Sequence, residues 1–277
     1  MMSDVTFGQY YPTDSFVHRC DPRMKIVFLI AYIVAVFLCD NFYGLAASAL
    51  VLILCVGFSR VPVRSVLKSV KGVIFLLIFT AVLNIFFYAG DTTVTIGGVA
   101  LQWGVINITV EGILFTVFLV CRLFMLVMAS SVLTLTTTPV SLTDGIESLL
   151  TPLKWVRFPV HELALIMSIA LRMIPTLLEE TDRIMNAQKA RGADFEHGGL
   201  IKRVRAIVPI LIPLLVGAFR RAEELGDAME ARCYSGSKTR TKYKKLTFSW
   251  RDLIGVLLAA ALITGVVLFN IYFPSVV

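Results

Sequence analysis

Two short segments of the chain carry the same arrangement of small and basic residues. "NAQKARG" ends at Gly192 and "DAMEARC" ends at Cys233, so an Ala-x-x-Ala-Arg pattern occurs twice. Alanines three positions apart lie on one face of a helix, where they allow another surface to approach closely. The arginine that follows offers five N–H donors in a planar fork. Each segment therefore has the residue types needed to dock a helix end into a groove on a partner protein.

The two segments correspond residue by residue when they are aligned on their arginines. The alignment pairs Ala187 with Ala228, Ala190 with Ala231, and Arg191 with Arg232. A structural interpretation stays open for each segment alone, because an arginine in the last turn complements the helix dipole and a glycine ends the helix. The occurrence of the pattern on two similar helices favours two equivalent partner sites.

Each pattern follows a long apolar segment that contains proline. "VHELALIMSIALRMIPTLL" covers residues 160–178, and "AIVPILIPLLVGAF" covers residues 206–219. We call these segments the stems and the polar helix ends that follow them the tips. In the first stem the apolar residues occupy more than one helical face, so we expect this helix to be covered from several directions.

The composition identifies an integral membrane protein, because 57% of the 277 residues are hydrophobic and only 16% are charged. We predict an all-α fold with about five transmembrane helices and a cytoplasmic domain of long helices. The predicted spans, each long and apolar enough to cross a bilayer, are residues 24–39, 42–58, 72–89, 112–135 and 253–273. Between the third and fourth spans, "TVTIGGVALQW" predicts a β-hairpin that turns at Gly97 and Gly98.

The distribution of basic residues predicts the topology. If both stems stay on one side of the membrane, every Lys and Arg except Arg122 lies on that side, as the positive-inside rule requires. We therefore place the N-terminus in the cytoplasm and the C-terminus outside. The predicted domains are a membrane domain (1–135), a cytoplasmic coupling-helix domain (136–251) and a final transmembrane helix (252–277).

A membrane protein with two cytoplasmic docking tips needs an energy source, and the chain has no phosphate-binding loop of its own. Here the sequence resembles the transmembrane coupling subunit, or T component, of energy-coupling factor transporters. The resemblance rests on "CDPRMKIV", "LTTTPVSL", "ALRMIPTLLEETDRIMNAQKARG" and "RRAEELGDAMEARCY". It implies a non-catalytic subunit in the plasma membrane, whose partners are two ABC-type ATPase subunits and a substrate-binding membrane subunit. ATP would be bound by those ATPases, with vitamins or metal ions as cargo.

The resemblance also implies which residues bind the ATPase subunits. In that family an Ala-Arg-Gly motif at the end of each of two coupling helices enters a groove of an ATP-binding subunit. The corresponding residues are Ala190, Arg191 and Gly192 at the first tip, and Ala231, Arg232 and Cys233 at the second. Cys233 departs from the glycine of the motif and enters a left-handed conformation less readily. We therefore expect the second helix to continue toward Gly236 or to end differently.

Other residue patterns predict structural roles. Asp21 and Pro22 fit the N-cap and first position of the first span. Arg122, inside a span, is either a pathway or hinge residue or an arginine paired with a helix carbonyl or an acid such as Glu111 or Glu147. The three histidines and five cysteines lack metal-ligand spacing, so we expect no metal site and no cofactor in the chain.

A second function stays open. A secondary transporter or channel would carry its own substrate, with Arg122 in the pathway, although the spans contain few other polar residues. The basic segment "SKTRTKYKKLTFSWR" stands just before the last span and is expected to meet anionic lipid headgroups rather than nucleic acid.

Overall fold

The computed structural model describes residues 10–87, 95–96, 99–100, 102–103, 106–107, 109–156, 159–193, 199–234 and 250–273. The chain divides into two compact units. We call the unit formed by Gly8–Val160 and Thr247–Val277 the helical bundle. The unit that contains His161–Leu246 is the two-helix unit. Residues 136–160 belong to the bundle, whereas the sequence predicts that the cytoplasmic domain begins at residue 136.

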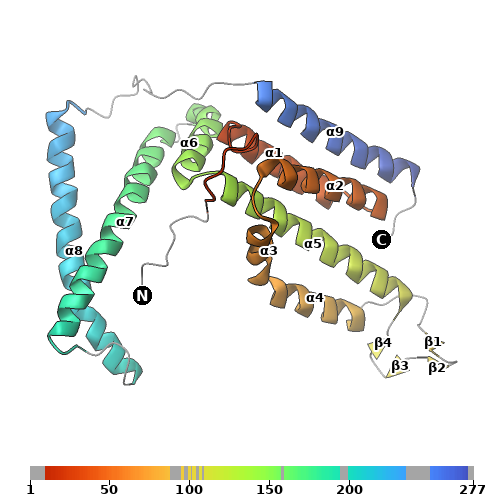
Figure 1. Ribbon diagram of the computed structural model, residues 1–277, viewed down its shortest axis with the longest axis horizontal. Helices are drawn as coiled ribbons and strands as arrows, with labels where there is room; N and C mark the ends of the chain where they lie inside the picture. Colours follow the sequence, from red (N-terminus) through yellow and green to blue (C-terminus); the bar gives the residue numbers. More distant parts are fainter. Residues whose placement is uncertain are drawn as a thin grey trace. The chain divides into compact units, whose positions relative to one another are not determined.

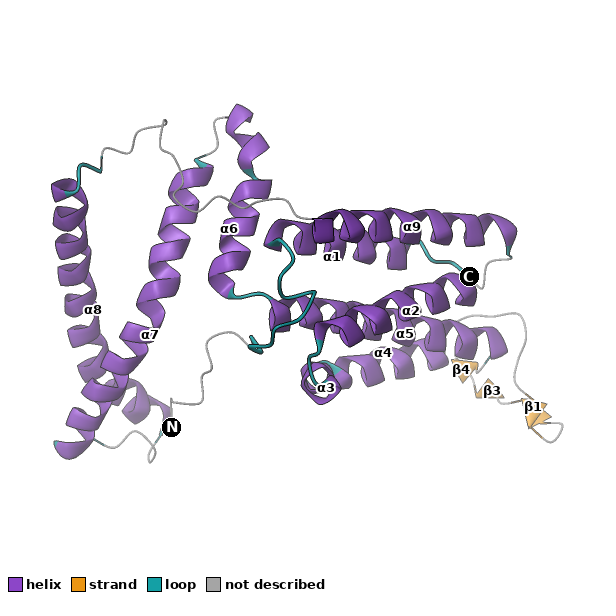
Figure 2. Ribbon diagram, turned by 45° about the horizontal axis from the view of Figure 1, so that its top comes forward, coloured by secondary structure: helices purple, strands orange, loops and turns teal. Residues whose placement is uncertain are grey.

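The helical bundle consists of seven α-helices and one 3-10 helix in the described residues. They are α1 (Pro22–Phe37), α2 (Phe42–Ser59), α3 (Val63–Lys71), α4 (Ile74–Phe87), α5 (Val110–Thr136), α6 (Pro139–Leu149), the 3-10 helix η1 (Thr151–Val156) and α9 (Trp250–Tyr272). Helices α1, α2, α5 and α9 run side by side, as Figures 1 and 2 both show, and α3 and α4 pack on α5. The core lies between them: Val36, Phe118 and Val266, from α1, α5 and α9, are at most 1% exposed.

Polar contacts tie α1 to α9 at both ends. At the start of α1, the Asp21 carboxylate accepts a hydrogen bond from the backbone N–H of Arg23 at 2.9 Å, and Pro22 is the first helical residue, which confirms the predicted cap. The Asp252 carboxylate of α9 accepts from the N–H of Asp21 at 2.9 Å. Just beyond the other end of α1, the Asn41 amide donates to the carbonyls of Phe269 and Phe273, both at 3.0 Å. The two helices therefore run parallel.

The segment between α4 and α5 contains two small antiparallel hairpins. Strands β1 (Thr95–Ile96) and β2 (Val99–Ala100) pair with Ile96 opposite Val99, which confirms the hairpin predicted there. The two glycines at its turn lie outside the described residues. A second hairpin, β3 (Gln102–Trp103) with β4 (Ile106–Asn107), was not predicted.

Length and composition allow four of the described helices to cross a membrane: α2, α5, α7 and α9. Helices α3 and α4, which meet at a bend of 59°, add a fifth if they form one broken span. The count agrees with the prediction of about five, but its members differ. Helix α7 is long and apolar enough to cross a membrane, whereas α1, with 16 residues, is shorter than a span needs. The side of the membrane on which α7 lies stays a prediction from charge.

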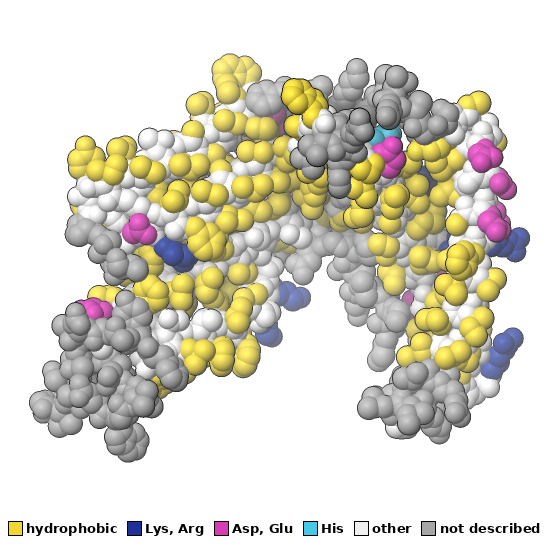
Figure 3. All heavy atoms as spheres, turned by 180° about the vertical axis from the view of Figure 1, so that it is seen from behind, with side chains coloured by type: hydrophobic (Ala, Val, Ile, Leu, Met, Phe, Trp, Pro, Cys, Tyr) yellow, Lys and Arg dark blue, Asp and Glu magenta, His cyan; other side chains and the backbone are white. Residues whose placement is uncertain are grey.

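The two-helix unit is built from α7 (Val160–Ala190) and α8 (Leu200–Ala231), of 31 and 32 residues. Pro175 lies inside α7, and Pro209 and Pro213 lie inside α8. The described part of the second stem exposes many large apolar side chains: Ile207, Val208, Leu211, Ile212, Leu215, Val216 and Phe219. Figure 3 shows hydrophobic side chains over much of the surface in view. Within this unit, few of the apolar side chains of the stems are buried against other residues, although the sequence predicts that they are buried on several faces.

Candidate docking site at two helix ends

The first tip ends in a compact hydrogen-bonded turn. Gly192 has a φ of 87°, a left-handed conformation that glycine adopts without steric cost. Its N–H donates to the carbonyl of Lys189 at 2.9 Å, and the N–H of Ala193 donates to the carbonyl of Gln188 at 3.0 Å. These two bonds define a Schellman motif, which satisfies carbonyls that the helix end would leave free. The motif fixes the direction in which Arg191 leaves the helix.

The second tip has the same geometry, so the expectation that it ends differently was wrong. Cys233 has a φ of 59° and takes the place of Gly192. Its N–H donates to the carbonyl of Glu230 at 2.8 Å, and the N–H of Tyr234 donates to the carbonyl of Met229 at 3.0 Å. A left-handed non-glycine residue costs about 1–2 kcal/mol. Each of the two bonds contributes about 1 kcal/mol, which offsets that cost. The helix therefore stops before Gly236.

The six residues predicted for partner binding lie at these two helix ends. Arg191 and Arg232 occupy equivalent positions, each directly before the left-handed residue, and both side chains are exposed. Ala190 and Ala231 are exposed as well. In the part of the chain that the structure describes, neither guanidinium takes part in a salt bridge. Each tip thus presents an exposed cation beside a small residue on a rigid helix end.

The two helices meet at an ion pair that the sequence analysis missed. The guanidinium of Arg221 on α8 donates to the Glu180 carboxylate on α7, and both side chains are about two-thirds buried. A Cβ atom at Gly217 would lie 3.3 Å from Oε1 of Glu180, so the absence of a side chain there lets the carboxylate approach α8. The alignment of the tips could have indicated this pair, because it places Glu180 and Arg221 at equivalent positions. Glu180 stands eleven residues before Arg191, and Arg221 stands eleven residues before Arg232.

Arg122 has partners inside the helical bundle. Its guanidinium donates to the carbonyl of Cys39, just beyond the end of α1, and lies 4.7 Å above the ring of Phe118. Both contacts stabilise a cation among apolar helices. They agree with the structural interpretation of this residue as an arginine paired with a backbone carbonyl.

Among the described residues, no group of three or more His, Cys, Asp or Glu side chains could hold a metal ion. All five cysteines are free thiols, of which Cys121 and Cys233 are exposed. His197 lies outside the described residues.

Comparisons with known proteins agree on one family. The family model described as "Cobalt transport protein" (CbiQ) matches residues 13–243. The chain is 44% identical to the energy-coupling factor transporter transmembrane protein EcfT of Ruminiclostridium cellulolyticum over 99% of this chain and 100% of the relative. It is 44% identical to the Bacillus subtilis protein of the same name over 95% of this chain and 98% of the relative. For that of Acidaminococcus fermentans the identity is 46%, over 95% of both chains.

Proposed function

Because the chain belongs to the CbiQ family of energy-coupling factor transporter transmembrane proteins, we propose that it couples ATP hydrolysis by two partner subunits to substrate import. One ABC-type ATPase subunit docks at each tip. ATP-driven closure of the two ATPases moves the tips, and the stems pass this motion to a substrate-binding membrane subunit. The cargo of that subunit is a vitamin or a metal ion.

The observation that carries this proposal is the equivalence of the two tips. Both helices end in a Schellman motif, both place an exposed arginine directly before the left-handed residue, and both arginines stand eleven residues from the ion pair between α7 and α8. A single arginine at a helix end is explained by the helix dipole. Two ends with the same capping hydrogen bonds support two pseudo-equivalent grooves on a pair of related partners.

The exposed stems support the second part of the proposal. Leu211, Leu215 and Phe219 on α8 are each more than half exposed within the two-helix unit. Large continuous apolar surfaces mark sites of protein or membrane contact. A membrane subunit that packs on the stems would bury this surface, and movement of the tips would be transmitted to it through the stems.

The competing function, a transporter that works alone, predicts a different energy source. The contacts of Arg122 with Cys39 and Phe118 support a structural role for that residue rather than a role as a pathway charge. Reconstitution into proteoliposomes separates the two functions. We expect uptake only when the ATPases, the substrate-binding subunit and ATP are all present. Uptake by the chain alone, driven by an ion gradient, would overturn the proposal.

A further inference from the structure

Two adjoining cavities lie at one end of the helical bundle. The larger, of about 510 Å³, is enclosed by the first turns of α1 and α9 and the last turns of α2 and α5. Its lining is almost entirely apolar and includes Phe28, Leu29 and Val132. The smaller, of about 480 Å³, is more open and is lined by both polar and apolar residues: Asp14, Ser15, Phe16, Arg19, Gly57, Phe58 and Arg60. Phe16 and Phe58 line both cavities, so the two cavities are adjacent there.

The polar groups within the larger cavity are already engaged by the protein. The Lys25 ammonium donates to the carbonyls of His18 and Thr136 at 3.3 and 3.0 Å and to the hydroxyl of Thr137 at 3.3 Å. An ammonium has three donors, and these contacts use them all. The Asp252 carboxylate, which is buried, accepts from the N–H of Asp21. The interior of this cavity therefore suits an apolar chain, and Lys25, the one basic residue among the described residues that line it, is already hydrogen-bonded.

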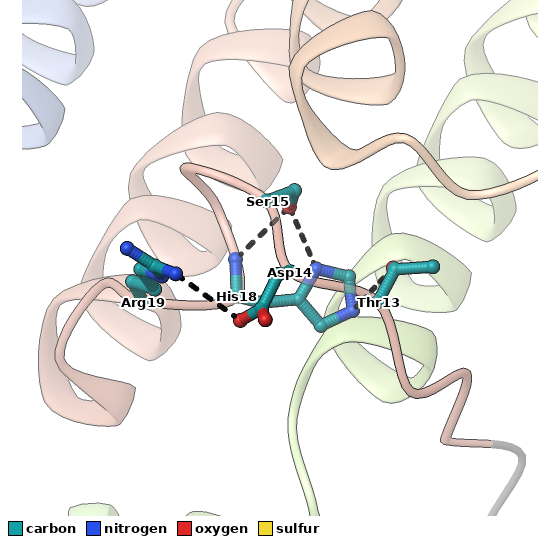
Figure 4. A network of polar contacts seen from close by, with 5 residues as sticks. All are labelled: Thr13, Asp14, Ser15, His18 and Arg19. Carbon is teal, nitrogen blue, oxygen red and sulfur yellow. Dashed lines mark hydrogen bonds and ion pairs between the residues drawn. The ribbon is translucent and has the colours of Figure 1, made fainter.

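The smaller cavity carries the free positive charge. Arg19 and Arg60 line it, and both side chains are exposed. The Asp14 carboxylate lies 3.5 Å from the Arg19 guanidinium, and both side chains are exposed. Among the described residues, Arg60 has no ion-pair partner. Figure 4 shows the turn that presents Arg19, held by hydrogen bonds of His18 to Ser15 and Thr13. The rim thus combines two guanidiniums with one carboxylate, a net positive charge that complements a phosphate diester.

We propose that the two adjoining cavities bind one anionic phospholipid. An acyl chain fills the apolar cavity, and the phosphate lies between Arg19 and Arg60. The volume falls within the range of ligand pockets, and burial of acyl methylenes in an apolar cavity stabilises a bound lipid. The same end of the bundle carries the basic helix α3, with Lys68 and Lys71 in its last turn, so it faces a membrane surface that attracts anionic lipid.

Native mass spectrometry of the delipidated full chain tests this proposal. The probes are dioleoyl phosphatidylglycerol, dioleoyl phosphatidylcholine and glycerol 3-phosphate, which has the headgroup charge without a chain. Gly255→Leu fills the apolar cavity, since the position lines it and a Cβ there meets nothing within 4 Å. Gly265→Leu is the matched control on the same helix, because its Cβ is equally free and it does not line either cavity.

Arg19→Gln combined with Arg60→Asn removes the charges, and asparagine tolerates the left-handed backbone of Arg60. Arg172→Gln with Arg183→Gln, on α7, is the charge-matched control, because both side chains are exposed and neither lines a cavity.

We expect one phosphatidylglycerol molecule per chain, bound about tenfold more tightly than phosphatidylcholine, and no binding of glycerol 3-phosphate. Gly255→Leu and the Arg19/Arg60 variant should each weaken phosphatidylglycerol binding by about tenfold, and both controls should retain it. If Gly255→Leu fails to fold, Ala129→Leu fills the cavity from α5. Equal binding of both lipids, or retention of phosphatidylglycerol by folded cavity-filling and charge variants alike, would overturn the proposal.

Discussion

Glu180 on α7 and Arg221 on α8 form an ion pair, and each stands eleven residues before the arginine of its own tip. At a rise of about 1.5 Å per residue, both tips lie about 16 Å along their helices from this contact. The pair therefore holds the two helices together at a point equally distant from both candidate docking ends. Such a contact suits a pivot, through which movement of one tip is passed to the other helix.

Breaking this ion pair should uncouple the tips without releasing the ATPases. We expect Glu180→Gln to lower ATP-driven uptake in proteoliposomes severalfold, because the pair is about two-thirds buried and Arg221 loses its partner. ATPase subunits should still copurify, since both tips are unchanged. The exchanged pair, Glu180→Arg with Arg221→Glu, should restore part of the uptake.

A matched control lies one residue away on α8. Arg220 and Glu224 form an ion pair at 3.1 Å, but both side chains are more than 60% exposed. Exposed pairs contribute little, so Glu224→Gln should leave uptake unchanged. An equal loss of uptake in both variants would show that the pair between α7 and α8 has no special role.

Cys233→Gly should stabilise the second tip. Cysteine at a φ of 59° carries a steric cost that glycine lacks, so we expect the last turn of α8 to gain about 1 kcal/mol. Hydrogen exchange of the backbone N–H groups of Cys233 and Tyr234 measures this gain, because both are donors in the capping turn. The reverse change, Gly192→Cys, should weaken the first tip by a similar amount. Unchanged exchange in both variants would contradict the equivalence of the two ends.

His18 should make the stability of the bundle depend on pH. Burial lowers the pKa of His18 below its ordinary value of 6.5, and the nearby Lys25 ammonium acts in the same direction. The folded state therefore favours the neutral imidazole, whose stabilising effect is complete above pH 6.5. It is lost as the pH falls below that value, because the unfolded chain binds the proton first.

Thermal unfolding of the purified chain in detergent checks this dependence. The midpoint should fall between pH 7 and pH 5 more steeply for the wild type than for His18→Gln. An identical slope in the two proteins would rule out His18 as the cause.

Local patterns were sufficient to predict the helices and the tip residues. Apolar run lengths located α1, α2, α4, α5 and α9 to within a few residues, and Asp21 followed by Pro22 correctly predicted how α1 begins. The two Ala-x-x-Ala-Arg patterns identified the ends of α7 and α8. These features depend on neighbours within one or two turns, which a sequence displays directly.

Features that depend on distant residues were missed or predicted wrongly. Glu180 and Arg221 stand forty-one positions apart, and nothing in either helix alone indicates that they meet. At Cys233, intrinsic conformational preference predicted a different helix end. The structure shows two capping hydrogen bonds there, which offset the cost of about 1–2 kcal/mol for a left-handed cysteine. The partner of Arg122, the carbonyl of Cys39, also depends on how α5 packs against the end of α1, which neither segment indicates alone.

The number of ATPase subunits bound per chain tests the account most directly. Coexpression and purification of the complex, followed by native mass spectrometry, should give two ATPase subunits on the wild-type chain. Arg191→Glu or Arg232→Glu alone should weaken one attachment, and the double variant should release both ATPases while the membrane helices stay folded. If the double variant keeps two ATPase subunits and full ATP-driven uptake, the tips are not the docking sites and the coupling mechanism is wrong.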